Sequence, residues 1–174
     1  MRLSHWDRRF LGLAEYIAGW SKDPSTKVGC VITDSRHRII SVGFNGLPAG
    51  VKDKPERLND REQKLLMVQH AEVNALNFAS RDTSGCIAYT WPLPPCTQCA
   101  GALIQAGIER VVAPELTGTH DRWERHIELT KKMFAEAGVQ VDLLPRPSSP
   151  REEGPGQPII HGCGAGSNCG KRCG

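Results

Sequence analysis

Along the chain, segments with apolar residues at helical spacing alternate with short apolar segments rich in β-branched residues. A spacing of three to four residues indicates a helix with one buried face, and a short apolar run bounded by turn residues indicates a strand. This pattern predicts helices over residues 3–20, 96–106 and 121–137, and strands over residues 28–33, 38–44, 86–91, 110–113 and 139–144. Ser4 is a candidate N-cap for the first of these helices.

The segments between these elements predict how they connect. Residues 34–37 have the length and composition of a hairpin turn, so the two strands beside them should pair antiparallel. Residues 45–59 are rich in Gly, Pro and charge and are predicted as a loop, followed by a helix that rises towards His70. The strand–helix alternation of the second half implies parallel crossovers. We therefore expect an α/β fold with a helix-flanked mixed sheet and an antiparallel hairpin at one side.

Length and composition indicate one domain followed by a tail. A chain of 174 residues is long enough for one ordinary domain with a real core and some extra length. After Leu144 the composition changes to Pro, Ser, Gly and charge, which gives a core nothing to bury. We expect a domain over residues 1–144 and a Pro/Gly/Cys-rich C-terminal tail over residues 145–174.

Charge and cysteine content restrict the partners and the compartment. The net charge of +3 is too small to indicate a nucleic-acid partner and suits a pocket for an anionic small molecule. Residues 1–20 interleave charged and apolar side chains, so we expect no secretory leader, and no later stretch is apolar enough to span a bilayer. Seven cysteines cannot all pair within one chain, which fits a reducing compartment. We expect a cytoplasmic protein with no membrane partner.

Two short segments carry the residues of a metal centre: His70 and Glu72, and then Cys96 and Cys99. A neutral imidazole and two thiolates bind zinc and leave the fourth tetrahedral position open for water, as in catalytic sites. Residues three apart share a helix face, so Cys96 and Cys99 can reach one metal. His70 and Glu72 can address one pocket only if His70 lies at the mouth of a helix and Glu72 in its first turn. The metal would then lie between two helix N-termini, whose partial positive charge favours thiolates.

Each of these segments has a more ordinary interpretation when taken alone. A Cys-x-x-Cys pair is often a redox pair or half of a structural zinc knuckle, and a lone His is usually a packed or surface residue. Here both halves occur together, and no fourth ligand for a structural site lies close by in the sequence. We therefore predict His70, Cys96 and Cys99 as zinc ligands, and Glu72 as the catalytic proton shuttle.

The combined signature resembles that of the zinc nucleobase deaminases. Further segments are similar to motifs of the deoxycytidylate deaminase branch of the cytidine deaminase superfamily, namely residues 22–29, 43–50, 70–76 and 104–108. The resemblance runs from about residue 11 to residue 144 and is to bacterial and phage enzymes in particular. It implies a three-layer α/β/α fold with a mixed five-stranded sheet.

The same resemblance implies an activity, which is zinc-dependent hydrolytic deamination of deoxycytidine monophosphate (dCMP) to deoxyuridine monophosphate (dUMP). Hydroxide from the zinc centre would attack C4 of the base, and Glu72 would protonate N3 and then the leaving amine. Effectors implied by the resemblance are deoxycytidine triphosphate as activator and thymidine triphosphate as inhibitor. Closed homo-oligomers, either hexamers or dimers, are also expected.

The resemblance also implies substrate-binding residues. Asn45 would hydrogen-bond the sugar, and Ser21 and Lys22 would lie near the 5′-phosphate. The alternative is a turn formed by Ser21 and Asp23, with Lys22 in solvent. Trp20 stands where many relatives have Arg, so the phosphate contact could instead come from Arg122 or Arg125.

Two other classes of function stay open. The first keeps the chemistry but changes the substrate to tRNA adenosine, guanine, a free nucleoside or a modified cytidylate. The tRNA enzymes generally have Glu before the Pro-Cys pair, whereas this chain has Pro94 there. The second is a non-enzymatic, zinc-stabilised binding module, against which the presence of Glu72 argues.

The predicted tail has potential metal ligands of its own: His161, Cys163, Cys169 and Cys173. Their spacings are not those of a standard zinc knuckle. They are either a flexible cluster of reactive thiols or a clip for a second zinc, and the family resemblance does not cover them.

Overall fold

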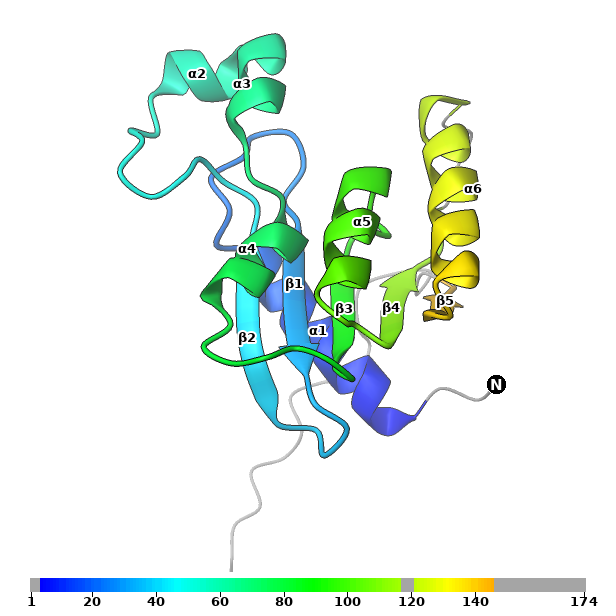
Figure 1. The fold of residues 1–174 in the computed structure, drawn as a ribbon. Helices are drawn as coiled ribbons and strands as arrows, with labels where there is room; N and C mark the ends of the chain where they lie inside the picture. Colours follow the sequence, from blue (N-terminus) through cyan, green and yellow to red (C-terminus); the bar gives the residue numbers. More distant parts are fainter. Residues whose placement is uncertain (1–3, 117–120, 146–174) are drawn as a thin grey trace, which may run out of the picture.

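The computed structural model describes residues 4–116 and 121–145, apart from the side chains of residues 121–124. Its elements, labelled in Figure 1, are α1 (His5–Ala18), β1 (Gly29–Thr33), β2 (Ile39–Phe44), α2 (Pro55–Asn59), α3 (Arg61–Met67), α4 (Ala71–Phe78), β3 (Ile87–Trp91), α5 (Thr97–Gln105), β4 (Arg110–Pro114), α6 (Asp121–Glu136) and β5 (Gln140–Leu144). The tail residues 146–174, with their predicted cysteine cluster, lie outside this description. Within the described ranges, none of the helices has the length and apolar character that a membrane crossing requires.

The strands form one mixed sheet in the order β2-β1-β3-β4-β5. β1 pairs antiparallel with both β2 and β3, whereas β3, β4 and β5 run parallel. The predicted hairpin and parallel crossovers are therefore confirmed. Because Gly29 lies opposite both Phe44 and Trp91, the start of β1 meets the ends of β2 and β3 at one edge of the sheet. The segments that lead to the two halves of the metal signature both leave from this edge.

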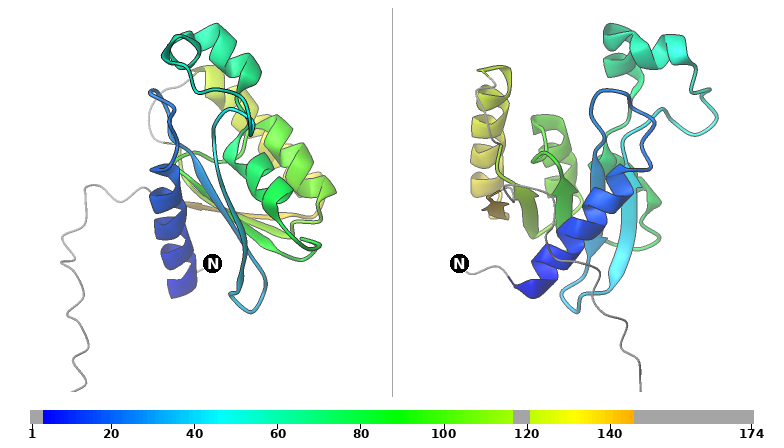
Figure 2. Two further views of the ribbon diagram at one scale, coloured as in Figure 1. Left: turned by 90° about the vertical axis from the view of Figure 1, so that its left-hand side faces the viewer. Right: turned by 180° about the vertical axis from the view of Figure 1, so that it is seen from behind.

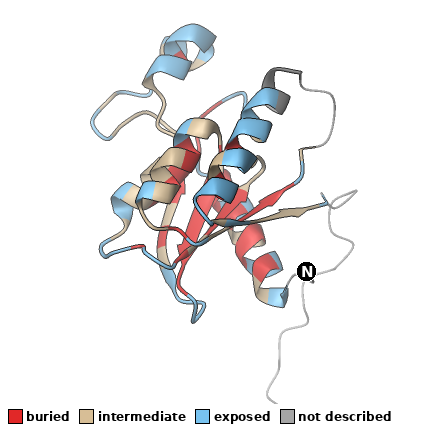
Figure 3. Ribbon diagram, turned by 45° about the vertical axis from the view of Figure 1, so that its right-hand side comes forward, coloured by how far each residue is buried: buried red, intermediate tan, exposed pale blue. Residues whose placement is uncertain are grey.

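Helices cover both faces of the sheet, which confirms the three-layer α/β/α fold. In Figure 2, α1 lies on one face and α4, α5 and α6 on the other. Each face buries its own apolar cluster, and Figure 3 shows that the central strands are the most continuously buried part of the molecule. Alternate residues of β1 serve the two clusters, since Cys30 and Ile32 face α4 while Val31 faces α1.

The first helix begins as its sequence predicts. Ser4 caps it, because its side-chain oxygen accepts a hydrogen bond from the Asp7 backbone N–H at 3.2 Å. The Asp7 carboxylate in turn accepts a hydrogen bond from the Ser4 backbone N–H at 2.9 Å. This reciprocal capping box satisfies backbone donors that an uncapped helix would leave unpaired.

The position of α4 is fixed by a close approach to β2. A Cβ atom on Gly43 would overlap the α4 backbone at Ala71 and Ala75, so only glycine allows the helix to lie this near. The Ser41 hydroxyl donates to the Ala75 carbonyl at 2.6 Å, and the Asn74 side chain donates to the last residue of β2 at 2.8 Å. These contacts set where the first turn of α4, and with it the metal segment, lies.

The prediction of a loop over residues 45–59 is wrong at its end, where α2 forms a single helical turn. Lys54 is its N-cap in extended conformation, and Pro55 follows at the first helical position, where a missing N–H costs nothing. The turn is too short to show hydrophobic periodicity, and none of its residues is buried. Within the described residues, α2 and α3 pack against each other and against no other helix or strand.

Candidate metal centre and active site

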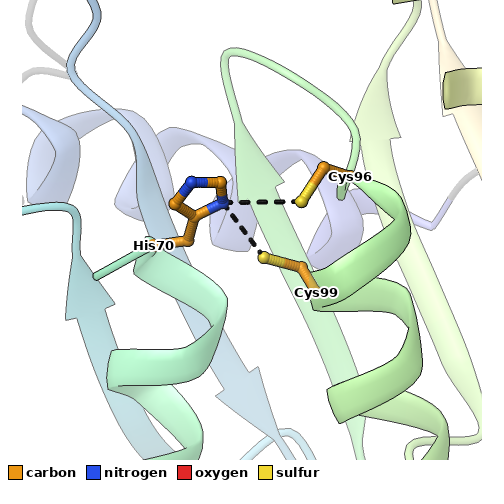
Figure 4. A group of neighbouring side chains, drawn as sticks. All are labelled: His70, Cys96 and Cys99. Atoms are coloured by element: carbon orange, nitrogen blue, oxygen red, sulfur yellow. Dashed lines mark hydrogen bonds between the residues drawn. The ribbon is translucent and has the colours of Figure 1, made fainter. Parts of the chain in front are cut away.

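The metal signature lies at two neighbouring helix N-termini. His70 is the N-cap of α4 and Cys96 the N-cap of α5, both in extended conformation, and Cys99 follows within the first turn of α5. α4 and α5 pack against each other, which brings the three side chains together, as Figure 4 shows. The predicted placement of His70 at the mouth of one helix and Glu72 in its first turn is confirmed.

The ligand atoms of these side chains fit a tetrahedral zinc ion. His70 Nδ1 lies 3.5 Å from Cys96 Sγ and 3.3 Å from Cys99 Sγ, and all the ligand atoms lie within 4.8 Å of one another. Normal zinc–nitrogen and zinc–sulfur bonds at a tetrahedral angle place the nitrogen and sulfur about 3.6 Å apart. The nitrogen and the two sulfur atoms are therefore spaced as in zinc centres that have one His and two Cys ligands.

The pKa of each of the three side chains depends on contacts with its neighbours in the centre. A hydrogen bond from the Cys99 thiol, followed by one from His70, lowers the pKa of Cys96 to about 4. The same bond to Cys96, together with burial, raises the pKa of Cys99 well above that of a free thiol. The Cys96 thiolate also raises the pKa of His70. For the three side chains to bind zinc, both thiols must ionise and the imidazole must be neutral.

Zinc binding is therefore expected to release at least one proton per metal ion at neutral pH, because the Cys99 thiol must ionise to become a ligand. More protons are released where His70 is charged. Since protons compete for the same atoms, zinc affinity should fall as pH falls. Calorimetric titration of the metal-free protein with zinc, in buffers of different ionisation enthalpy, measures the proton count, and binding without proton release would contradict this assignment.

Glu72 is the buried acid beside this centre. Its side chain is only 3% exposed, and burial raises its pKa above the ordinary value. It lines the same cavity as His70 and Cys96 but does not belong to the group of ligand atoms. A carboxyl group with a raised pKa can both accept and donate a proton near neutral pH.

A cavity of about 260 Å³ opens in front of the centre, close to the lower end of the range for small-molecule sites, roughly 300 Å³. Its walls come from the loop between α1 and β1, from the end of β2, from α3 and from the N-termini of α4 and α5. The lining residues are Asp23, Ser25, Thr26, Val28, Asn45, Arg61, Lys64, Leu65, Val68, His70, Ala71, Glu72, Leu93, Pro94 and Cys96.

Asn45 lies in this wall, where its side chain is already held by the protein. Its side-chain oxygen accepts a hydrogen bond from the Val28 N–H at 2.8 Å. Its amide group donates to the Thr26 carbonyl at 2.9 Å and to the Asp23 carboxylate at 3.4 Å. Because both amide hydrogens are engaged, contact with a sugar requires the sugar hydroxyl to donate to the remaining lone pair of the oxygen.

Ser21 and Lys22 do not line the cavity. The Ser21 hydroxyl donates to the Asn45 carbonyl at 2.8 Å and accepts from the Asp23 N–H at 3.2 Å, which makes the turn described as the alternative above. Lys22 is exposed and pairs with Asp53 at 2.7 Å. Their predicted role in phosphate binding stays a prediction.

The other phosphate candidates named from the sequence are not seen at the cavity either. Arg125 is exposed on α6 and does not line it, and the side chain of Arg122 lies outside the described part of the chain. Sequence reasoning did not single out Arg61 or Lys64, both of which line the cavity from α3. The sequence did predict a helix leading to His70. The charged residues of that helix, which include Arg61 and Lys64, could have been considered as residues of the site.

The metal centre and Glu72 together can catalyse the addition of water to an amino-substituted ring. A three-ligand metal centre leaves room for water, and a buried proton-carrying acid beside it can move protons to a ring nitrogen and to a departing amine. The fold and the site together define a zinc-dependent deaminase. A family model described as the cytidine and deoxycytidylate deaminase zinc-binding region matches residues 4–115. The chain therefore belongs to the cytidine and deoxycytidylate deaminase family.

Individual relatives agree with this assignment. A protein of Aliivibrio fischeri named "Uncharacterized deaminase in luxG 3'region" is 47% identical over 144 residues, covering 82% of this chain and 96% of the relative. Human deoxycytidylate deaminase is 41% identical over 113 residues, covering 62% of this chain and 63% of that enzyme. The dCMP deaminase of cyanophage S-TIM5, solved in complex with dCMP and dUMP, superposes with a TM-score of 0.64 at 21% identity, covering 83% of this chain and 100% of the phage chain, and so shares the fold.

Proposed function

We propose that this protein catalyses the hydrolytic deamination of dCMP to dUMP with release of ammonia. The observation that carries the proposal is the buried Glu72 beside a zinc-fitting His-Cys-Cys group in a cavity with cationic side chains. Human deoxycytidylate deaminase at 41% identity, and a Caenorhabditis elegans protein named "Probable deoxycytidylate deaminase" at 37%, support dCMP as the substrate.

The chain's own residues account for each proton in this reaction. His70, Cys96 and Cys99 would hold the zinc, which when bound supplies a hydroxide nucleophile near neutral pH. Glu72 accepts the proton lost from water and delivers it to N3 as oxygen adds to C4. It then takes the proton of the new C4 hydroxyl and passes it to the amine as the C4–N bond breaks. Water and dCMP thus become dUMP and ammonia, and Glu72 ends in its starting state.

Apolar residues of the cavity would hold the base and limit the entry of bulk water. Val28, Val68, Leu93 and Pro94 lie in its wall between the loop before β1 and the N-terminus of α5. Asn45 would accept a hydrogen bond from a sugar hydroxyl through the lone pair left free by its backbone contacts. Apolar walls combined with fixed polar groups are typical of a small-ligand site.

A substrate panel tests the proposed function. Ammonia release should be fastest with dCMP among cytidine, deoxycytidine, their mono- and triphosphates, guanine and tRNA, each assayed with the zinc-loaded protein. The predicted order places dCMP above deoxycytidine. Preferred turnover of guanine or of tRNA would replace dCMP with another base, and a zinc-loaded protein inactive on the whole panel would favour the non-enzymatic binding module.

Further properties implied by the family resemblance belong to the same proposal. These are activation by deoxycytidine triphosphate, inhibition by thymidine triphosphate, assembly into a closed homo-oligomer, and a cytoplasmic location that keeps the ligand cysteines reduced. The deaminase unit would end near Leu144, since β5 completes the sheet there. Activity assays with each effector, light scattering, and assays of a chain shortened to this residue test these statements separately.

A further inference from the structure

The side chain of Asn45 is held by the loop between α1 and β1. Its oxygen accepts a hydrogen bond from the Val28 N–H at 2.8 Å, and its amide group donates to the Thr26 carbonyl at 2.9 Å. The amide group also donates to the Asp23 carboxylate at 3.4 Å. Because these partners all lie within residues 23–28, the shape of this short segment decides where the remaining lone pair of the Asn45 oxygen is directed.

Asp23 sets the shape of that segment. One of its carboxylate oxygens accepts hydrogen bonds from the backbone N–H groups of Ser25 and Thr26, at 2.7 and 3.1 Å, which closes a turn. The other oxygen accepts the hydrogen bond from Asn45. Asp23 therefore acts on Asn45 directly and also through the turn, which presents the Thr26 carbonyl to the Asn45 amide group.

Lys64 of α3 is the charge partner that allows the Asp23 carboxylate to stay buried. The two side chains meet at 2.8 Å and are 5% and 8% exposed. Burial alone would raise the pKa of Asp23, but hydrogen bonds from Lys64 and from the turn outweigh it, and the pKa is lower than that of an ordinary aspartate. A buried carboxylate without its partner is strongly destabilised. Without the ammonium group, we expect Asp23 to rotate towards water and the turn to open.

We infer that Lys64 is a positioning residue for substrate binding: acting through Asp23, it holds Asn45 so that the free lone pair of the Asn45 oxygen accepts a hydrogen bond from the substrate sugar. A deoxynucleoside monophosphate has one free sugar hydroxyl, at C3′, so the contact depends on a single group of the substrate. Lys64 needs no contact with the substrate for this role. The inference rests on the proposed function and adds to it a residue that lies 41 positions from the carboxylate that it holds.

Lys64→Met tests the inference. We expect the KM for dCMP to rise about 3- to 10-fold, as for the loss of one hydrogen bond, with kcat nearly unchanged because the sugar lies away from the reacting carbon. Dideoxycytidine monophosphate lacks the 3′-hydroxyl, so its KM should already be higher in the unaltered protein and should not rise further in the variant. With deoxycytidine, the rise should be as large as with dCMP, because the phosphate takes no part.

Asp23→Asn is a second test, and it changes the shape of the site very little. One carboxylate oxygen becomes an amide group that can only donate hydrogen bonds. If this group lies beside the amide of Asn45, two donors face each other, and if it lies beside the backbone N–H groups of the turn, the turn opens. In either orientation Asn45 loses a partner, so we expect the same rise in KM for dCMP and none for dideoxycytidine monophosphate. This variant decides the question alone if Lys64→Met does not fold.

Lys54→Met is the matched control, because it removes the same group from an exposed position at the start of α2, outside the cavity wall. It should leave the KM for all three substrates unchanged, and circular dichroism and zinc analysis check that each variant is folded and loaded. An unchanged KM for dCMP in Lys64→Met and Asp23→Asn would overturn the inference. An equal rise with dideoxycytidine monophosphate would also overturn it, since this would indicate general damage to the cavity.

A rise confined to dCMP and absent with deoxycytidine would overturn the inference as well, because Lys64 would then act on the phosphate and not on the sugar. Failure of the proposed function gives a different result, since the unaltered protein would then deaminate neither dCMP nor deoxycytidine.

Discussion

Glu72→Gln should lower kcat by about 10²- to 10⁴-fold while zinc content and fold stay unchanged. Gln has nearly the same shape as Glu and brings no charge, so it fits a site that is 3% exposed. Its amide cannot carry a proton from water to N3 and then to the departing amine. Because Glu72 is not one of the metal ligand atoms, the centre should still bind one zinc per chain.

Metal analysis beside a steady-state assay with dCMP measures both halves of this prediction. Glu136→Gln, an exposed change at the end of α6, is the matched control and should keep full activity. Full turnover in Glu72→Gln would show that another group moves the protons. Loss of zinc together with activity would instead give Glu72 a structural role at the centre.

Arg110→Met should lower the free energy of unfolding by about 3–5 kcal/mol, because it leaves a buried carboxylate without its charge partner. Arg110 makes a two-pronged contact with Asp7, at 2.8 and 3.1 Å, and the Tyr89 hydroxyl donates to the same carboxylate at 3.0 Å. Asp7 is only 2% exposed. Arg110 also pairs with Asp142 of β5 at 2.6 Å, so the change loosens both α1 and the last strand.

Denaturant unfolding monitored by circular dichroism measures this loss. Lys22→Met is the control, since the side chain of Lys22 is 69% exposed and that of its partner Asp53 32% exposed, and exposed pairs contribute about 0–1 kcal/mol. Similar losses in the two variants would contradict the special role of the buried contact.

The contact between Arg110 and Asp7 also makes the stability of the protein depend on pH. Burial alone would raise the pKa of Asp7, but hydrogen bonds from Arg110, the Ser4 backbone and Tyr89 outweigh it, and the pKa in the folded protein is lower than that of an ordinary aspartate. The contribution of Asp7 is therefore complete above its unfolded pKa and is lost as pH falls through the folded value. Acid unfolding of Arg110→Met should begin at higher pH.

The elements and the metal centre could be predicted because their signals are local. Strand and helix periodicity repeats within one segment, and the Cys96–Cys99 spacing is a property of a single helix turn. The two halves were joined by the known signature, and the register of β1 with the ends of β2 and β3 explains why they meet. The N-cap position of His70 could be predicted from local sequence as well. His70 and Glu72 are two residues apart, and such a pair can reach one pocket only at the start of a helix.

The opposite wall of the cavity could not be predicted, because its contacts join distant segments. Lys64 and Asp23 are separated by 41 positions, and a lysine in an exposed-looking helix gives no sign that it will be buried. The Asp7–Arg110 contact spans 103 positions and has no local pattern at all. Ser21 and Lys22 stand out in the sequence because they adjoin a turn, yet the side chains that face the cavity there are Asp23, Ser25 and Thr26.

The isolation of α3 has a consequence for its local stability. This helix packs on α2 alone among the helices and strands of the described chain, and a side-chain ion pair with the α1–β1 loop links it to the domain. Its amide hydrogens should therefore exchange with solvent through a small local opening and not through unfolding of the whole domain. A nucleotide in the cavity, which α3 partly lines, would oppose that opening. Substrate occupancy and the order of this one helix would then rise together, and the energy of ordering it would be drawn from nucleotide binding.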